Sequence, residues 1–303
     1  MQAEIHHTPD APDAIDPLAI LTHLGVEDAG AVTRVHGGWD TAIWRVERPG
    51  GGSALRLFRA QQRAVCEREV AAMRAAAAAG IPVPEVQAQG TWHERPVLLL
   101  SWCPGRPLAQ ELESRPWRAW HLGRAFGRLQ ARLRTVPAPA TLRRERWEWI
   151  EWAGPLDGPL KGRLIELAGA AEVLLHLDYH PLNVLTDGAQ ITAVLDWANA
   201  RTGDARADVA RTYTILRVMP LPRTATSAAV ALVRRLLARG WQHGYREVAG
   251  DLPAMAAFYA WAGEVMVRDL TPKLGTPGIW LQPSHLAAIQ RWTATWRRRA
   301  GLP

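Results

Sequence analysis

Cysteine and lysine are scarce in this chain of 303 residues: Cys66 and Cys103 are its only cysteines, and Lys161 and Lys273 its only lysines. Two cysteines exclude a disulfide framework and a cysteine-rich zinc site, and they favour a reducing compartment over secretion. No apolar run is long enough to cross a bilayer, and the first residues lack the apolar stretch of a signal peptide. We therefore expect a soluble cytoplasmic protein with no membrane partner.

The remaining composition is that of a globular protein, with 48% hydrophobic and 21% charged residues. It excludes collagen-like and disordered chains, and the length allows one large domain or two smaller ones. The net charge is +7, but the arginines are spread along the chain, and the one dense run, at 297–299, is typical of a solvated tail. We expect no nucleic-acid partner; duplex DNA binding is an alternative suggested by charge alone, which salt-dependent association would reveal.

The first third of the sequence predicts a small antiparallel sheet. Short β-rich runs separated by Gly and Pro fill residues 32–59. A helix is predicted over 64–79, and a further strand over 96–102. Residues 1–17 show no periodicity and are treated as a leader. We place the domain boundary at the proline- and glycine-rich linker 104–107.

The rest of the sequence is mainly helical. Further helices are predicted at 116–135, 161–171, 207–216, 224–239, 253–270 and 283–298. Between them, an Asp187-Gly188 turn predicts a hairpin over 183–196. Together these patterns predict an α+β fold with two lobes. The first, residues 1–103, holds the small antiparallel sheet, and the second, residues 104–303, holds most of the helices.

Three polar residues near this hairpin carry the strongest functional signal. Asp178 precedes Asn183 by five positions on the loop that leads into the first strand, and Asp196 follows the second strand. Because hairpin pairing brings the two strand ends together, we expect the three side chains to converge on one point. Two carboxylates and an amide oxygen suit Mg²⁺. Phosphoryl transfer needs such a metal site and a carboxylate that accepts the hydroxyl proton.

The stretch from His176 to Asn183 resembles the H-x-D-x-x-x-x-N loop of the aminoglycoside phosphotransferase and choline kinase-like family, relatives of the protein kinases. Residues 203–210 are similar to the Gly-Asp-Pro-x-x-Asp-Leu-Ala segment of that family, with Ala205 in place of the proline. The resemblance covers roughly residues 32–270. It implies a two-lobed protein-kinase-like fold and an ATP-dependent phosphotransferase that moves the γ-phosphate to a hydroxyl group of a small molecule, with ATP and Mg²⁺ as cofactors.

Within the second lobe, the resemblance assigns a role to each residue of the motif. Asp178 would be the catalytic base, or would at least orient the acceptor hydroxyl. Asn183 and Asp196 would hold Mg²⁺. His176 would pack beneath the loop as a structural residue, and Asp208 would brace the loop by accepting backbone hydrogen bonds.

In the first lobe, the resemblance implies a nucleotide site. Its residues would be Gly37, Gly38, Arg56, Glu69, Trp102 and Cys103. The two glycines would form a turn over the phosphates, and the last two residues would belong to a hinge whose backbone binds adenine. Glu69 matches a glutamate that pairs with a lysine in the family, but the lysine position holds Arg56. Arginine keeps the charge although its planar fork differs from an ammonium group, and we interpret it as a tolerated substitution.

Some of these functional interpretations have a structural alternative. His180 could act as a second acid or base, but a structural or substrate-edge role is favoured for it beside a carboxylate base. Trp147, Trp149 and Trp152 could stack on an acceptor ring, although packing in the core is favoured.

The acceptor itself stays open between an antibiotic, which would mean antibiotic resistance, and a sugar or other metabolite alcohol. From Arg201 onward the sequence has 15 Lys and Arg against 6 Asp and Glu. This balance argues against a polycation such as an aminoglycoside, which needs an acidic pocket. Glu264 and Asp269 could bind a cationic acceptor, but solvated helix carboxylates are favoured. A non-catalytic nucleotide-binding protein, suggested by Arg56, is the alternative function.

Overall fold

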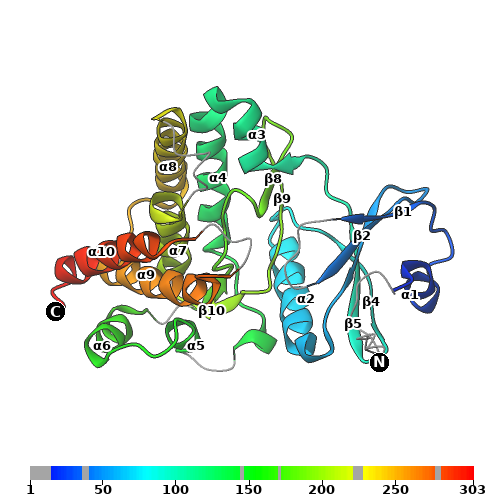
Figure 1. The fold of residues 1–303 in the computed structure, drawn as a ribbon, viewed down its shortest axis with the longest axis horizontal. Coiled ribbons are helices and arrows are strands. Elements are labelled where there is room, and N and C mark those ends of the chain that lie inside the picture. Colours follow the sequence, from blue (N-terminus) through cyan, green and yellow to red (C-terminus); the bar gives the residue numbers. More distant parts are fainter. Residues whose placement is uncertain (1–14, 36–40, 144–146, 170–171, 221–227, 277–280) are drawn as a thin grey trace, which may run out of the picture. The chain divides into compact units, whose positions relative to one another are not determined.

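The computed structural model describes residues 15–35, 41–143, 147–169, 172–220, 228–276 and 281–303. The chain divides into two compact units, each with its own apolar core (Figure 1). The first unit runs to Val70 and includes 84–102, and the second comprises 71–83 and everything from Cys103 onward. A small antiparallel sheet in one unit and mostly helices in the other confirm the expected α+β class. No helix in these ranges is long and apolar enough to span a membrane.

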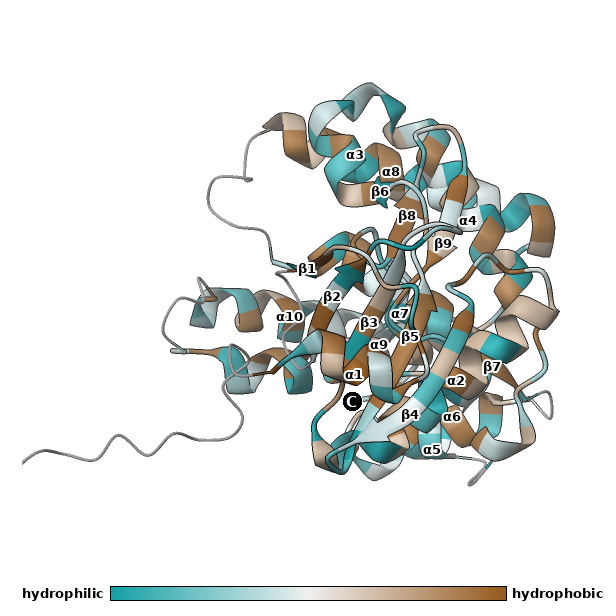
Figure 2. Ribbon diagram, turned by 90° about the vertical axis from the view of Figure 1, so that its right-hand side faces the viewer, coloured by the Kyte–Doolittle hydropathy of each residue, from teal (hydrophilic) through white to brown (hydrophobic). Residues whose placement is uncertain are grey.

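A five-stranded antiparallel sheet with the order β1-β2-β3-β5-β4 forms the first unit. Its strands are β1 (Val32–Val35), β2 (Ala42–Val46), β3 (Ser53–Leu57), β4 (Val86–Trp92) and β5 (Arg95–Ser101). Apolar and polar residues are mixed in β3, whereas β5 is mostly apolar (Figure 2), and five consecutive residues of β5 are buried. This continuous run is why the strand was visible in the sequence.

Strand β4 was missed in the sequence because its signals are weak. None of its residues is fully buried, only Ala88 and Trp92 pack against the apolar cluster of the sheet, and the turn that joins it to β5 is His93-Glu94. Both turn residues have positive φ, 43° and 63°, as a tight hairpin turn requires. The sequence signals of such a turn are Asn-Gly and Asp-Gly, which place no bulky side chain in the left-handed region.

Helix α1 (Pro17–His23), which the sequence did not predict, covers the sheet's core. Asp16 caps it by accepting a hydrogen bond from the N–H of Leu18 over 2.9 Å. Ile20 and Leu21 are buried in one cluster with residues of β2, β3 and β5. Helix α2 (Arg63–Ala78) follows the sheet's third strand, close to the predicted 64–79.

Eight α-helices lie wholly within the described residues of the second unit, which also takes in the end of α2. They are α3 (Leu108–Ser114), α4 (Ala119–Leu133), α5 (Glu148–Glu151), α6 (Gly158–Leu167), α7 (Ala205–Val218), α8 (Ala228–Ala249), α9 (Ala256–Leu270) and α10 (Pro283–Arg299). Short 3₁₀ helices span Ala60–Gln62, Pro116–Arg118, Ala140–Leu142 and Thr271–Lys273. Trp149 of α5 is buried and stacks on Phe258 of α9, so for this tryptophan the core interpretation is confirmed.

Helices α4 and α8 lie side by side along much of their length (Figure 1). Glycines on both helices make the close approach possible. A Cβ atom at Gly127 would stand 2.0 Å from the carbonyl oxygen of Trp241, and one at Gly244 would stand 2.1 Å from that of Arg124. The sequence predicted that this helix ends at Arg239, but α8 continues to Ala249, because its glycines serve helix packing rather than termination.

Two small sheets complete the second unit. Their strands are β6 (Arg106–Pro107), β7 (Val173–Leu175), β8 (Val184–Thr186), β9 (Ile191–Val194) and β10 (Arg201–Gly203). Strands β6, β8 and β9 pair in that order, and β7 pairs with β10. Part of the expected linker 104–107 is therefore a strand. The predicted β8–β9 hairpin is confirmed, with a turn over 187–190 in which Asp187 Oδ1 accepts two backbone hydrogen bonds.

Candidate active site

The β8–β9 hairpin joins the two ends of the predicted motif. Val184 pairs with Val194, and beyond this pair the N–H of Leu195 donates to the carbonyl oxygen of Asn183 over 2.8 Å. Asp196 follows directly in the chain. The local pairing of two short strands is therefore what positions Asp196 next to the loop that carries Asn183.

The Asp178 carboxylate contacts two side chains of its own loop. The side-chain amide of Asn183 donates to Asp178 Oδ2 over 3.2 Å and to the Asp178 carbonyl oxygen over 3.1 Å. His180 Nε2 lies 3.5 Å from Asp178 Oδ1. Burial alone would raise the pKa of this carboxyl, but the hydrogen bond and charge of His180, helped by Arg211, lower the pKa to about 2. Asp178 is ionised at neutral pH.

His180 is oriented by the backbone of the loop. The N–H of Leu182 donates to His180 Nδ1 over 3.2 Å. The proton of the neutral ring therefore belongs on Nε2, the nitrogen that faces Asp178. In this arrangement His180 donates toward the carboxylate and is not placed to act as a second base.

His176 joins the loop to the second strand end. Its ring is buried, Nδ1 accepts from the N–H of Asp178 over 3.2 Å, and Nε2 lies 3.0 Å from the carbonyl oxygen of Leu195. Since Nδ1 is an acceptor, Nε2 carries the proton and donates to Leu195. One imidazole thus fixes the backbone at Asp178 and at the residue before Asp196.

Asp208 holds the same loop from α7. Its Oδ1 accepts from the N–H groups of His176 and Leu177 over 3.0 and 2.6 Å. Leu177 has φ 60°, a conformation that is costly for a non-glycine residue. Arg211 Nε donates to the Leu177 carbonyl oxygen over 3.2 Å. Hydrogen bonds at both ends of Leu177 therefore stabilise its unfavourable backbone.

Gln130 is a supporting residue that the sequence analysis missed. Its Nε2 donates to Asp208 Oδ2 over 2.9 Å and to Thr212 Oγ1 over 2.8 Å, and its Oε1 accepts from Trp241 Nε1 over 2.7 Å. It is buried on α4 among apolar residues. A lone amide on the apolar face of the predicted 116–135 helix was the available signal, since a buried amide requires partners.

Asn183 and Asp196 offer the donor atoms that a hard cation takes. Asn183 directs its amide nitrogen to Asp178, so its oxygen is the atom left for an ion. Asp196 is exposed and has φ 61°. Within the described ranges no three His, Cys, Asp or Glu side chains form a group that could hold a metal. The residues therefore fit an ion that takes few protein oxygens and completes its shell with water and phosphates, as Mg²⁺ does.

In the first unit, Arg56 on β3 and Glu69 on α2 form a buried ion pair. Arg56 Nη1 lies 2.6 Å from Glu69 Oε1, and Arg56 Nε donates to Thr41 Oγ1 over 3.1 Å. The guanidinium also lies 4.7 Å from the ring centre of Phe58. The arginine therefore makes the ion pair that the resemblance assigned to a lysine. Gly37 and Gly38, the predicted phosphate turn, lie outside the described residues.

The predicted hinge residues Trp102 and Cys103 stand where the chain passes from the first unit to the second. The N–H of Trp102 donates to the carbonyl oxygen of Gly52 over 2.9 Å, which extends the pairing of β3 and β5. This amide is already used, so an adenine at this segment would need other backbone groups. Cys103 is half-buried.

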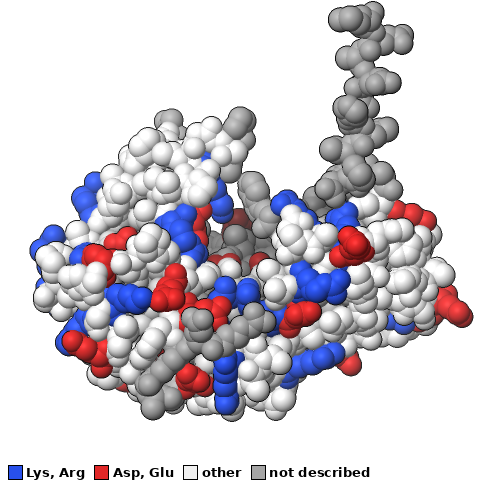
Figure 3. Space-filling view, turned by 90° about the horizontal axis from the view of Figure 1, so that it is seen from below, with Lys and Arg blue, Asp and Glu red and all other residues white. Residues whose placement is uncertain are grey.

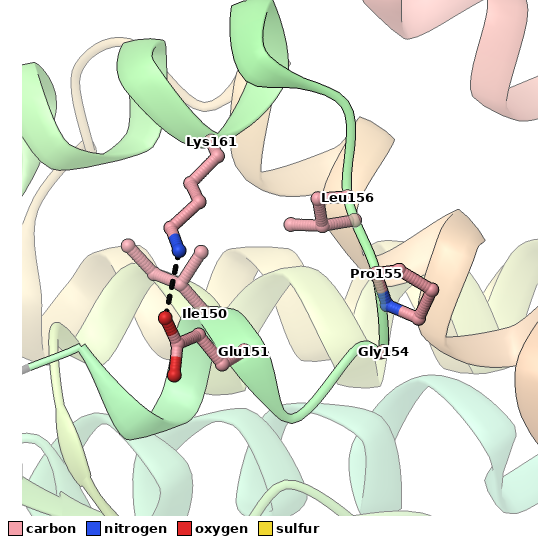
Figure 4. Close-up of a pocket in the computed structure, with 6 residues that line it drawn as sticks. All are labelled: Ile150, Glu151, Gly154, Pro155, Leu156 and Lys161. Carbon is pink, nitrogen blue, oxygen red and sulfur yellow. Dashed lines mark hydrogen bonds and ion pairs between the residues drawn. The ribbon is translucent and has the colours of Figure 1, made fainter.

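A cavity of about 310 Å³ lies where α5 leads to α6, away from the motif residues. Its lining in the described part of the chain consists of Ile150, Glu151, Gly154, Pro155, Leu156 and Lys161 (Figure 4). Lys161 Nζ and Glu151 Oε1 pair over 2.7 Å beside it. Since these charges satisfy each other and no predicted site residue lines the cavity, it carries no part of the chemistry described above.

The excess of basic residues forms no single patch on the face shown in Figure 3, where acidic and basic side chains are interspersed. Part of the basic C-terminal run is also paired, since Arg297 lies 2.7 Å from Asp157. The expectation of a solvated tail at 297–299 is therefore wrong for Arg297, whose side chain is only 15% exposed.

Comparisons with known proteins bear on the family and the fold. A model of the phosphotransferase enzyme family matches residues 31–258. No curated protein sequence matches significantly. One similar solved structure is a thermostable mutant of the aminoglycoside phosphotransferase APH(4)-Ia in a ternary complex with ADP and hygromycin B. It has 17% identity and a TM-score of 0.67, and the match covers 94% of this chain and 98% of that one.

A second is the amicoumacin kinase hAmiN in complex with AMP-PNP, Ca²⁺ and Ami, with 14% identity, a TM-score of 0.63 and 94% of each chain covered. A third, aminoglycoside-3'-phosphotransferase of type VIII, has 18% identity and a TM-score of 0.53, with 78% of this chain and 94% of that one covered. At these identities the likeness concerns the fold. The kinase-like fold that the resemblance implied is confirmed.

Proposed function

This chain belongs to the phosphotransferase enzyme family, and from this premise we propose that it transfers the γ-phosphoryl group of ATP to a hydroxyl group of a small molecule. The expected enzyme class, a small-molecule phosphotransferase, is confirmed by the family match. The observation that carries the finer proposal is the ionised Asp178, which the amide of Asn183 orients in a loop braced from both sides.

In this proposal Asp178 orients the acceptor hydroxyl and accepts its proton. A carboxylate with a pKa of about 2 is a weak base. That suits phosphoryl transfer, in which the bond to the leaving group is largely broken before much charge develops on the attacking oxygen, so positioning matters more than basicity. His180 Nε2 and the Asn183 amide fix the two carboxylate oxygens.

Asn183 and Asp196 would hold Mg²⁺ through an amide and a carboxylate oxygen. When bound, the ion supplies positive charge to the phosphate oxygens of the nucleotide. His176 keeps the two ligands in register, because it is hydrogen-bonded to the loop at Asp178 and to the strand end at Leu195.

Nucleotide binding is assigned to the first unit. Arg56, held by Glu69 and Thr41, would bind phosphate oxygens, and Gly37-Gly38 would cover them. Support comes from the solved relatives, which hold ADP and hygromycin B in one case and AMP-PNP and amicoumacin in the other. An antibiotic and a metabolite alcohol are both compatible with this proposal, since each offers a hydroxyl group as acceptor.

The test combines nucleotide binding with turnover. A ligand that binds the folded state raises the melting temperature by mass action. We expect ATP with Mg²⁺ to stabilise the wild type, and we expect Asp196→Ala to abolish the Mg²⁺-dependent part of this shift. Asp178→Asn should keep the shift but lower the slow hydrolysis of ATP by at least about a hundredfold, the usual range for loss of an acid–base group.

Glu113→Gln serves as the control, because it removes an exposed carboxylate from α3, outside the loop. It should match the wild type in both measurements. Undiminished hydrolysis in Asp178→Asn, or a shift that ignores Asp196, would refute the proposed function.

A further inference from the structure

Three arginines from separate elements surround one half-buried tryptophan. The guanidinium carbons of Arg268, Arg211 and Arg201 lie 4.3, 5.6 and 5.9 Å from the centre of the Trp152 ring. They come from α9, α7 and β10, and the tryptophan closes α5. We call these four residues the arginine cluster. Like charges gathered around one ring repel one another unless anions balance them.

The carboxylates at the cluster are already bound to its arginines. Asp269 Oδ2 accepts from Arg211 over 3.1 Å, and Asp269 Oδ1 accepts from Arg268. Arg201 Nε lies 3.1 Å from Glu148 Oε1. Within the described residues, Asp269 is thus shared by two guanidinium groups, while Glu148 pairs with the third.

Arg211 connects the cluster to the reacting end of the site. Its Nε donates to the carbonyl oxygen of Leu177, the residue before Asp178. The two side chains are close enough for the arginine to help lower the pKa of the Asp178 carboxyl. A small molecule that presents a hydroxyl to Asp178 therefore has the Arg211 guanidinium near it. Arg268 lies one step further, on the other oxygen of the Asp269 carboxylate.

Donor atoms remain in the cluster after these pairs are made. Arg211 is 4% exposed, and its Nη1 is buried without a hydrogen-bond partner among the described residues. Arg268 directs Nε and Nη2 to Asp269. These two bonds use one edge of the planar Arg268 guanidinium. The Arg268 side chain is 34% exposed. The other edge of such a fork matches the two oxygens of a carboxylate or phosphate.

From these contacts we infer that the acceptor of the proposed reaction carries an acidic group, a carboxylate or a phosphate, which binds at Arg268 while its hydroxyl faces Asp178. The inference rests on the proposed function and narrows its substrate class. It also disfavours a polycationic antibiotic, because such a molecule would lie beside the like charges of Arg211 and Arg268.

The two carboxylates of α9, Glu264 and Asp269, do not form a binding site for a cationic acceptor. The sequence analysis favoured solvated carboxylates at Glu264 and Asp269, with cation binding as the other possibility. Asp269 is neither, since two arginines bind it. Burial raises the pKa of Glu264, whose charged neighbours are Arg297 and Asp157 rather than the cluster.

Four ring-matched probes test the inference on the full chain with AMP-PNP and Mg²⁺ present. Glucuronate and glucose 6-phosphate are acidic, glucose is neutral and glucosamine is cationic. Calorimetric titration should give at least about tenfold tighter binding for one acidic probe than for glucose and glucosamine, the scale of a charge-assisted contact. Whichever of the two acids binds more tightly shows whether the site prefers a carboxylate or a phosphate.

Arg268→Gln should remove most of this preference, and its melting temperature checks that it is folded. Arg163→Gln is the matched control, because Arg163 pairs with Glu166 on the surface of α6; it should keep the preference. The inference is overturned if neither acid binds more tightly than glucose and glucosamine, if the preference survives Arg268→Gln, or if it exists only without AMP-PNP, which would mean that the arginines bind nucleotide phosphate.

Failure of the proposed function is a separate result. If AMP-PNP does not bind, or if Asp178→Asn leaves ATP hydrolysis unchanged, the reaction is wrong. The charge preference of the probes can still be measured in that case, in the absence of nucleotide.

Discussion

The loop at 176–183 and the arginine cluster are neighbours in the second unit, and they differ in how fully their polar groups are hydrogen-bonded. In the loop, Asp178 contacts Asn183 and His180, and both ring nitrogens of His176 meet backbone groups. In the cluster, Arg211 and Arg268 share the Asp269 carboxylate, and a buried nitrogen of Arg211 has no partner among the described residues.

The difference follows from what each region does in the proposed reaction. Groups that position reacting atoms must hold one geometry, and satisfied hydrogen bonds provide it. Groups that bind a substrate need donors that are still available when it arrives. Arg211 belongs to both regions, since Nε fixes the loop at Leu177 and Nη2 binds Asp269.

The largest expected effect comes from disturbing the packing of α4 against α8, since α4 carries the Gln130 that supports the loop. Gly127→Ala would place a methyl group 2.0 Å from the carbonyl oxygen of Trp241, so α4 and α8 must separate. We expect a loss of more than about 3 kcal/mol in the free energy of unfolding, because backbone atoms cannot move aside as a side chain can. Urea denaturation followed by circular dichroism measures it.

Gly162→Ala on α6 is the matched control, since nothing lies within 4 Å of a Cβ atom there. The same substitution should stabilise the protein by about 0.5–1 kcal/mol, the helix propensity gained over glycine. Equal effects of the two substitutions would show that the helices are not in contact at Gly127.

A smaller effect is expected from a change that weakens the support of the loop and leaves the arginine cluster intact. Gln130→Leu leaves Asp208 Oδ2 and Trp241 Nε1 without their buried partner, which costs about 1–3 kcal/mol for each unsatisfied group. Because Asp208 braces the backbone before Asp178, kcat should fall while the acidic-probe preference stays. Gln110→Leu, the same change at an exposed position of α3, should alter neither. A Gln130→Leu enzyme with wild-type kcat would contradict the bracing role.

The smallest expected effect is a substitution on α9 that raises the melting temperature, whereas the preceding changes at Gly127 and Gln130 destabilise the protein. Burial raises the pKa of Glu264 above its usual 4.5, so ionising it is harder in the folded state than in the unfolded one. Its contribution to stability is therefore complete below pH 4.5 and is lost as the pH rises through the raised pKa. Glu264→Gln should melt at a higher temperature than the wild type at pH 8 and at the same temperature near pH 4.

A thermal series across this pH range measures the difference. A lower melting temperature for Glu264→Gln at pH 8 would mean that attraction to Arg297 outweighs burial, against the direction expected here. Charge preference for the sugar probes should not change in this variant, since Glu264 lies outside the arginine cluster.

The sequence alone determined the parts of the site that depend on local spacing. The β8–β9 hairpin is closed by a short turn, so the positions of Asn183 and Asp196 follow from residues within one segment. The ion pair of Arg56 and Glu69 was also expected, but from the resemblance to the family rather than from spacing. By contrast, β4 escaped notice because its turn residues carry no turn signal.

Only the tertiary structure decided the contacts between distant segments. Gln130 reaches Asp208 across 78 positions of sequence, and Arg211 reaches Asp269 across 58. Such pairs depend on how closely helices approach one another. The glycines of α4 and α8 permit a close approach, but a glycine in a single sequence does not indicate which helix will pack against it. The physical reason is that a hydrogen bond within a turn is set by chain geometry, whereas a bond between helices is set by how the whole core packs.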